Sequence, residues 1–333
     1  MNIGTFAIWS ALAALHLWSA QPCRASFFEM SLERNSIYTP GRMRLVMGLT
    51  DEAAVEARYT VGVNILAQEV LIRNQIVPLT KDAPAVFELD FPETRNRTVV
   101  RCRAELSIDG NFIEARERPL LLWPPLAPMQ KPPQDETIWV FDTSGALQRI
   151  LRDLHVNASD ATFQAIRDFQ IPDIIFVGEN VGLKNFDTLS SRILVKDENL
   201  KVIVFLRQEE SPEAWPVQVL PAGPSPRSVS CDPNSPLLLG LNKLDIMNVL
   251  SGAVPMKITR PADKQWSLGS YIGESKENEE KVHSYLAVIR QPGMTRVYCQ
   301  VPITTHFYEE PRSAVLLKNL LQFGYGECVS PNH

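Results

Sequence analysis

The sequence predicts two domains, an all-β domain followed by an α/β domain built in three layers. Through the first third of the chain, apolar residues alternate with polar ones, which is the period of a half-buried strand. The remainder instead alternates short apolar strands with segments of helical periodicity. A proline-rich segment separates the two patterns, and 333 residues are enough for two domains with separate cores.

Residues 26–123 are expected to form the all-β domain. Within 59–65 every second residue is apolar, which turns one face of a strand inward. Asp109-Gly110 is a strong hairpin signal, and Thr39-Pro40-Gly41 marks another turn. About seven strands at this spacing predict an immunoglobulin-like sandwich. The other strand-like runs are 42–49, 86–91, 98–108 and 112–122.

Residues 124–136 are expected to link the domains. Five of the ten residues from Pro124 to Pro133 are proline, which favours an extended and semi-rigid spacer. The period of the apolar residues changes across this segment, so the sequence places the domain boundary here.

The α/β domain is expected to span residues 137–327, with a short tail at 328–333. Its strands are apolar on both faces, which predicts a parallel sheet covered by helices on both sides. The closing helix is expected at 309–323, with Pro311 in its first turn and Gly324 just past its end. The other strands are expected at 137–141, 173–177, 201–206, 284–290 and 295–301, and helices at 147–154, 161–169 and 186–194.

The N-terminus is typical of a secretory signal peptide, expected over residues 1–25. Residues 5–18 form an apolar segment too short to span a bilayer as a helix, and Cys23-Arg24-Ala25 resembles a cleavage site. The alternative is a buried N-terminal helix, since residues 1–4 carry no Lys or Arg. We expect export to the periplasm or the extracellular space, with no membrane span after cleavage. A net charge of -5 gives no electrostatic footprint for nucleic acid.

Cysteine and glycine patterns give no sign of a metal or nucleotide site. Cys102, Cys231, Cys299 and Cys328 would remain after cleavage, with no CxxC pair and no zinc-ligand spacing. An oxidising compartment would permit some of them to pair, although Cys299 lies in an apolar strand and is expected to be a buried thiol. The sequence contains no G-x-G-x-x-G and no P-loop motif. We therefore expect no cofactor and no metal.

The strand at 201–206 ends where many enzymes with this kind of sheet carry a nucleophile. Such folds place Ser or Cys in a Gly-x-Ser-x-Gly or Gly-x-Cys-x-Gly turn after the strand. Here the turn is Leu206-Arg207-Gln208-Glu209-Glu210, without Ser, Cys or flanking Gly. We expect Arg207 to form surface or interface ion pairs.

Four further residues are candidate ligand or interface positions. Asp142 follows a strand and precedes a helix, where open α/β sheets bind ligands, although a capped helix start is the favoured alternative. Trp215 is expected to be an exposed aromatic platform for a sugar or a partner, the alternative being ordinary packing. His306 and Glu309 resemble the base and acid of a triad, but a half-exposed His and a carboxylate at a helix N-terminus are the alternative.

The second domain resembles the non-catalytic C-terminal region of some bacterial family 2, β-galactosidase-like glycoside hydrolases. That region has a class I glutamine amidotransferase-like, flavodoxin-like fold and often follows a small β-sandwich. The resemblance rests on the following segments: 140–142, 172–178, Ser235–Leu241 with Asp245-Ile246, 297–301, Glu310-Pro311 and 316–321. Ser235 replaces a His of the family signature, and Met247-Asn248-Val249-Leu250 stands where the family has Trp.

The resemblance implies a protein without glycosidase activity of its own. A catalytic (β/α)8 barrel needs about 200–250 residues, for which the chain has no room, and the paired carboxylates would lie on that barrel. We expect an exported, non-catalytic module that acts in glycan association or protein assembly, with a carbohydrate, a glycosidase or a second copy as partner. The alternatives are a hydrolase or amidotransferase with an unrecognised nucleophile, and an accessory subunit of a glycosidase whose barrel is on another chain.

Overall fold

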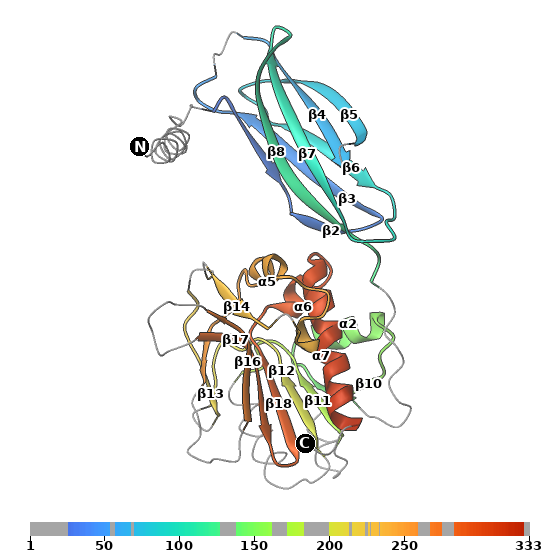
Figure 1. The fold of residues 1–333 in the computed structure, drawn as a ribbon, viewed down its shortest axis with the longest axis vertical. Helices are drawn as coiled ribbons and strands as arrows, with labels where there is room; N and C mark the ends of the chain where they lie inside the picture. The colour runs from blue at the N-terminus through green and yellow to red at the C-terminus, as the bar shows by residue number, and fades with distance from the viewer. Residues whose placement is uncertain are drawn as a thin grey trace, which may run out of the picture. The chain divides into compact units, whose positions relative to one another are not determined.

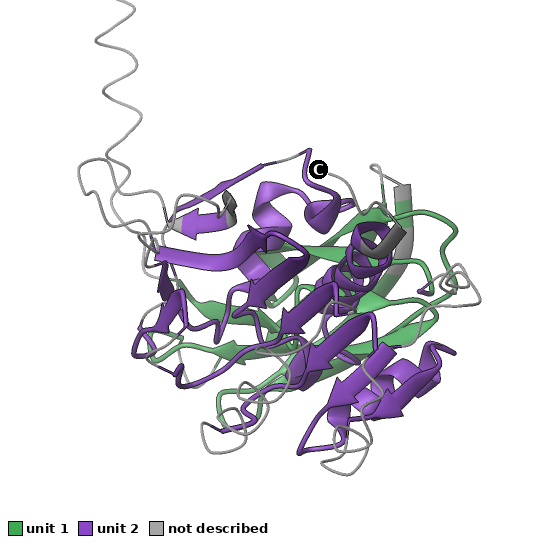
Figure 2. Ribbon diagram, turned by 90° about the horizontal axis from the view of Figure 1, so that it is seen from below, with its two compact units in different colours: residues 1–125 green, residues 126–333 purple. Residues whose placement is uncertain are grey.

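The computed structural model divides into two compact units, residues 1–125 and 126–333, which are coloured separately in Figure 2. The signal peptide expected at 1–25 and the helices expected at 161–169 and 186–194 fall wholly or almost wholly outside the described residues, as does most of the linker. The structure describes residues 26–53, 57–67, 70–126, 138–161, 172–182, 200–212, 215–223, 226, 228–232, 234–258, 267–274 and 283–329.

The first unit consists of two β-sheets. One sheet has the strand order β1-β3-β6 and the other has the order β2-β8-β7-β4-β5. The strands are β1 (Phe28–Leu32), β2 (Ser36–Tyr38), β3 (Gly41–Leu49), β4 (Tyr59–Ala67), β5 (Val70–Leu79), β6 (Ala85–Phe91), β7 (Thr98–Ile108) and β8 (Asn111–Trp123). Figure 1 shows them running along the length of the unit.

The two sheets of this unit pack around one core. Side chains on β4 alternate between buried and half-buried positions, as the period of two in residues 59–65 predicts. Leu45 of β3 and Phe87 of β6 join Val63 of β4 in the same apolar cluster, so both sheets contribute their inner faces.

The predicted hairpin at Asp109-Gly110 is confirmed. β7 and β8 are antiparallel, and Ile108 pairs with Asn111 across the turn. Asp109 and Gly110 both have positive φ, at 48° and 83°. A two-residue turn with positive φ at both positions matches the twist of the flanking strands, and glycine adopts this conformation without a Cβ clash.

The second unit is built on one mixed sheet. Five neighbouring strands are parallel, in the order β10-β9-β11-β12-β18, and β17 continues the sheet antiparallel to β18. These strands are β9 (Ile138–Phe141), β10 (Ala158–Asp160), β11 (Ile174–Val177), β12 (Val202–Phe205), β17 (His283–Gln291) and β18 (Met294–Cys299). The sheet is completed by β13 (Val217–Val219), β14 (Val229–Cys231), β15 (Met256–Ile258) and β16 (Ser267–Glu274). Every residue of β9, β11 and β12 is buried, as their apolar sequences predict.

Helices are fewer than strands among the described residues of this unit. They are α2 (Ala146–Asp153), the 3-10 helix η1 (Pro236–Leu238), α5 (Lys243–Val249), α6 (Ile303–His306) and α7 (Pro311–Val329). Figure 1 shows α2, α5 and α6 at one end of the sheet and α7 lying along one face. None of the helices in the described part of the chain is both long and apolar enough to cross a membrane.

The predicted end of the closing helix is wrong. The sequence places it before Gly324, but α7 continues through Gly324 to Val329. A Cβ on Gly324 would lie 3.6 Å from the Cγ2 atom of Ile174 in β11. This is an ordinary van der Waals distance, so Gly324 is an interior residue of α7 that faces the sheet, and it does not terminate the helix.

Candidate functional site

The carboxyl ends of the parallel strands carry the main polar cluster of the second unit. Asp142 follows β9, Glu179 lies just beyond β11, Arg207 and Gln208 lie just beyond β12, and Gln300 follows β18. Because parallel strands end at the same edge, these residues come from four neighbouring loops. Open α/β sheets bind their ligands at this edge, so we call these residues the strand-end cluster.

Gln208 lies at the centre of the strand-end cluster. Its side chain is buried, and Nε2 donates to the carbonyl oxygens of Gly178 at 2.6 Å and Leu206 at 2.8 Å. Its Oε1 accepts from the Val181 N–H at 3.0 Å. The Gln208 backbone N–H in turn donates to Oε1 of Gln300 at 3.0 Å. One amide side chain thus joins the loops that follow β11 and β12, and its backbone adds the loop after β18.

Glu179 fastens helix α6 to the same edge. Its carboxylate is buried and accepts from the Thr304 N–H at 2.6 Å and from Oγ1 of Thr305 at 2.8 Å. The first N–H groups of a helix have no partner within the helix, so a carboxylate placed there satisfies them. Both oxygens of Glu179 are therefore occupied by α6.

Asp142 caps the start of helix α2. Its Oδ1 accepts from the N–H of Ser144 at 3.0 Å and from its Oγ at 2.8 Å, while Oδ2 accepts from the Leu147 N–H at 2.7 Å. The carboxylate also lies against Gly178, where an added Cβ would come within 2.7 Å of Oδ1. Glycine is needed there for this close approach. Of the two interpretations of Asp142, these contacts favour the capped helix start.

Arg207 lies in the loop after β12, with its side chain 19% exposed. Its Nη2 atom is 3.8 Å from Oε1 of the exposed Glu209. Its carbonyl oxygen accepts from the Asn180 N–H at 2.9 Å, which ties the loop to the one after β11. The ion pair with Glu209 agrees with the expectation from the sequence, and an ion pair this exposed contributes little to stability.

His306 ends helix α6, and Glu309 lies in the turn that follows. The His306 carbonyl accepts from the N–H groups of Glu309 at 3.1 Å and Glu310 at 2.8 Å. The imidazole is half-buried and the Glu309 side chain is exposed. Glu179 holds α6 against the strand-end cluster, so the structure brings His306 to this end of the sheet.

Two nucleophilic side chains near the turn after β12, one just beyond it and one in the neighbouring strand β18, serve the fold. Ser211, just beyond the turn after β12, accepts the Val219 N–H with its Oγ at 2.9 Å and so holds β13. Cys299 is buried in β18, and burial raises the pKa of its thiol to about 12. A thiol that stays protonated is a poor nucleophile, which supports the expectation that Cys299 is inert.

The expectation that Trp215 is an exposed platform is wrong. Trp215 is buried, and its ring centroid lies 4.5 Å from that of Phe205 and 5.7 Å from that of Tyr298. Phe205 and Tyr298 stack on each other at 4.9 Å. The large apolar area of the indole is satisfied by this aromatic cluster on one face of the sheet, so ordinary packing explains Trp215.

Sequence reasoning missed Glu179, Gln208 and Gln300 as parts of the strand-end cluster. All three are buried polar residues that directly follow an apolar strand or come within three residues of its end. A buried polar group needs hydrogen-bond partners, so a polar residue at such a position is a signal that could have identified them. The loops that these three residues join depend on the order of the strands in the sheet, and local sequence patterns do not predict that order.

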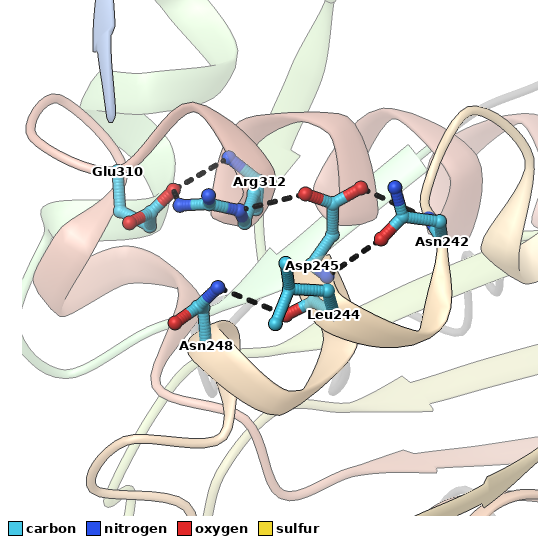
Figure 3. Close-up of polar contacts among 6 residues, drawn as sticks. All are labelled: Asn242, Leu244, Asp245, Asn248, Glu310 and Arg312. Carbon is cyan, nitrogen blue, oxygen red and sulfur yellow. Dashed lines mark hydrogen bonds and ion pairs between the residues drawn. The ribbon is translucent and has the colours of Figure 1, made fainter. Parts of the chain in front are cut away.

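A second polar cluster joins helices α5 and α7, as Figure 3 shows. Nε of Arg312 donates to Oδ1 of Asp245 at 3.0 Å, and Nη1 donates to Oε1 of Glu310 at 2.8 Å. Asp245 also forms a capping box with Asn242, accepting its backbone N–H at 2.9 Å. Arg312 and Asp245 are both buried.

These contacts give a structural role to the segment Ser235–Asp245. Ser235 caps η1 through the Leu237 N–H, and Gly240 has a φ of +80° that favours glycine. Asn319 of α7 donates its Nδ2 to the carbonyls of Leu237 at 3.1 Å and Leu239 at 2.9 Å. The motif therefore holds α5 and η1 onto α7.

Within the described ranges, no three His, Cys, Asp or Glu side chains are grouped so that they could hold a metal ion. Cys102, Cys231 and Cys299 are free thiols.

No protein-family model matches the sequence, and no curated protein matches it. The chain is similar to a CARDB domain from Pyrococcus furiosus, with 12% identity, a TM-score of 0.23, and coverage of 29% of this chain and 91% of that one. It is also similar to a β-glucuronidase from Parabacteroides merdae, with 11% identity, a TM-score of 0.23, and coverage of 56% of this chain and 26% of that one. An FMN-binding β-glucuronidase from Facaelibacterium prausnitzii is similar over 55% of this chain and 34% of that one, with 9% identity and a TM-score of 0.22.

The chain therefore spans about a quarter to a third of the two β-glucuronidase chains. At TM-scores this low, the similarities carry no conclusion about the activity of this chain.

Proposed function

We propose that the chain is an exported, non-catalytic module that associates with glycans or with a glycosidase partner. In this proposal the first domain, residues 26–123, is an immunoglobulin-like sandwich, and the second, residues 137–327, is flavodoxin-like and related to class I glutamine amidotransferases. The parallel strands support the second assignment. Their order in the sheet is β10-β9-β11-β12-β18. If these five strands are numbered 1 to 5 along the chain, that order is 2-1-3-4-5, which is the order of flavodoxin-like sheets. Export predicts a mature N-terminus just after Ala25, which N-terminal sequencing of the secreted protein tests.

The main support for this proposal is that backbone N–H groups of the strand-end cluster already donate hydrogen bonds to side chains of the protein. Acyl transfer needs a nucleophile, a base within reach, and backbone N–H groups free to bind the developing oxyanion. Near the end of β12 the Val181 N–H already donates to Gln208, and the Gln208 N–H already donates to Gln300. Two backbone donors near this position are therefore already satisfied by side chains of the protein itself.

His306 does not alter this argument. A general base accelerates acyl transfer by taking a proton from a nucleophile that it can reach. The turn beyond Phe205 holds the buried Leu206, the ion-paired Arg207 and the hydrogen-bonded Gln208. This arrangement supports binding or assembly over hydrolysis as the use of the second domain.

Affinity electrophoresis of the full chain through gels that contain single polysaccharides tests the proposed function. The panel consists of one neutral polysaccharide, one pectic polysaccharide and one other charged polysaccharide. Bovine serum albumin is the non-binding control. We expect retardation by at least one polysaccharide and no release of reducing sugar from any of them. Unretarded migration in every gel would contradict association with glycans, and the release of reducing sugar would contradict the non-catalytic role.

A further inference from the structure

A hollow of about 450 Å³ lies between the end of helix α2 and the edge strand β10. Leu151 and Val156 supply its apolar part. The polar part is supplied by Gln148, Arg152, His155, Asn157 and Asp160. Pockets for small ligands are typically about 300–1,000 Å³ and combine an apolar surface with a few polar groups, so the size and composition of the hollow suit such a ligand.

The polar side chains of the hollow differ from those of the strand-end cluster. Gln208 and Asp142 satisfy their hydrogen bonds within the protein. The five polar side chains of the hollow, in contrast, make no hydrogen bond or ion pair with any residue that the structure describes. Within the described part of the chain no group occupies their donors and acceptors, and Arg152, His155, Asn157 and Asp160 are exposed.

His155 is held at the hollow by an unusual backbone conformation. It follows the last turn of α2 with a φ of 57°, in the left-handed region where helix ends normally carry glycine. Its N–H donates to the Arg152 carbonyl at 3.0 Å, and the Val156 N–H donates to the Leu151 carbonyl at 2.9 Å. This is the Schellman hydrogen-bond pattern. A glycine would satisfy it with less strain, so the imidazole is present at some cost to stability.

The charged side chains of the hollow indicate which kind of ligand it would bind. Arg152 and His155 come from the helix side of the hollow, and a guanidinium favours a carboxylate through paired N–H donors. Asp160 comes from the strand side and can only accept hydrogen bonds when ionised, which suits hydroxyl groups. Gln148 and Asn157 both donate and accept, as hydroxyl recognition requires.

We propose that this hollow binds a uronic acid, with its carboxylate toward Arg152 and His155 and its hydroxyl groups toward Asn157 and Asp160. The proposal rests on the proposed glycan association and names the site and the class of sugar. It assigns recognition to hydrogen bonds and charge, because the described residues that line the hollow include no Phe, Tyr or Trp.

Isothermal titration of the full chain with D-glucuronate and D-galacturonate tests the site, with D-glucose and D-galactose as neutral counterparts. We expect at least one uronate to bind, and its neutral counterpart to bind at least about tenfold more weakly, since a charge-assisted hydrogen bond is lost. Arg152→Ala is expected to raise the Kd of the uronate about tenfold or more for the same reason. Arg149→Ala is the matched control, because Arg149 is exposed on the same helix but does not line the hollow.

His155→Gly separates binding from folding. Because glycine adopts the left-handed conformation without strain, this variant is expected to have a higher Tm than the wild type. Its Kd for the uronate is expected to be at least about threefold higher, because the imidazole is lost. Equal Kd values for wild type, Arg152→Ala and His155→Gly would overturn the site, and so would equal affinity for the uronate and its neutral counterpart. If the wild type is retarded by a polysaccharide but binds neither uronate, the site is wrong and the proposed function stands. If it binds no sugar in either experiment, both the site and the proposed glycan association fail.

Discussion

Arg312 in the first turn of α7 donates its Nε to Oδ1 of Asp245 in α5 at 3.0 Å, with side-chain exposures of only 4% and 1%. The same guanidinium reaches Glu310, and Asp245 accepts the Asn242 N–H (Figure 3). Two segments 67 residues apart in sequence are thereby joined by a buried ion pair. A buried pair is strongly destabilising to break, although a well-packed apolar replacement can be neutral.

Removing one partner of this pair should destabilise the second unit. Asp245→Ala removes one of the two carboxylates that pair with the buried Arg312 guanidinium, and Glu310 remains as its partner. Because a charge-assisted hydrogen bond is lost, we expect a loss of about 1.5–3 kcal/mol in the free energy of unfolding. The matched control is Lys201→Ala, which removes the half-exposed pair with Asp173 at 3.6 Å and should cost about 0–1 kcal/mol. Urea unfolding followed by circular dichroism measures both variants. Similar losses for the two would contradict the role assigned to the buried pair.

Gln208 should be required for stability at the end of the sheet. Gln208→Leu keeps much of the side-chain volume but leaves the carbonyls of Gly178 and Leu206 and the Val181 N–H without their partner. Unsatisfied buried groups of this kind cost about 1–3 kcal/mol each, reduced where the loops relax. Gln218→Leu, at an exposed position of β13, should change stability by no more than about 0.5 kcal/mol. Thermal unfolding that ranks the two variants equally would show that Gln208 does not organise these loops.

The stability of the protein should fall in alkaline solution. Burial raises the pKa of Cys299 from 9.0 to about 12, partly offset by a backbone hydrogen bond from Val301 and reinforced by Glu179. Burial also raises the pKa of Cys102 to about 12. Between about pH 9 and pH 12 the unfolded chain loses thiol protons that the folded protein keeps, so the free energy of unfolding decreases as the pH rises.

Urea midpoints measured at pH 8 and pH 10.5 test this pH dependence. Cys299→Ala lowers stability at both pH values through lost packing, but its decrease between them should be smaller than that of the wild type. An equal decrease in the variant and the wild type would show that the Cys299 thiol does not contribute to the pH dependence.

Much of the fold follows from local patterns. The period of two in β4, the Asp109-Gly110 turn and the wholly apolar β11 and β12 identify these elements, because each depends on neighbours in sequence. The antiparallel half of the sheet was less predictable, since β13 and β15 are short strands of three residues that only their tertiary partners define. Gly324 likewise resembled a helix stop until its contact with β11 was known.

The candidate site could be predicted only in part. The sequence identified the turn after β12 and the loop after β9, because both follow apolar strands. The sequence did not show that Gln208 fills the turn after β12 through its contacts with Gly178 and Val181. It also did not show that Glu179 holds α6. In both cases the partner residues come from other loops. Trp215 was misjudged because its sequence neighbours Glu213 and Pro216 suggest an exposed loop, whereas Phe205 and Tyr298 enclose it.

The proline-rich segment should be the first site of proteolysis. Residues 124–136 contain the expected linker, and the two compact units divide between Pro125 and Leu126. Proteases cut exposed connections before folded domains, so limited digestion should yield two fragments that persist. Mass spectrometry of the earliest products locates the cut, and a first cut within β3 to β8 would contradict the boundary.

The absence of acyl-transfer activity is the central claim, and one assay tests it most directly. Wild type and His306→Ala are incubated side by side with glutamine and with activated esters, and ammonia and free acid are measured. The Val181 N–H donates to Gln208, the Gln208 N–H donates to Gln300, and Arg207 cannot attack a carbonyl. We therefore expect both proteins to match the rate without protein. A wild-type turnover above that rate, lost in His306→Ala, would contradict the account.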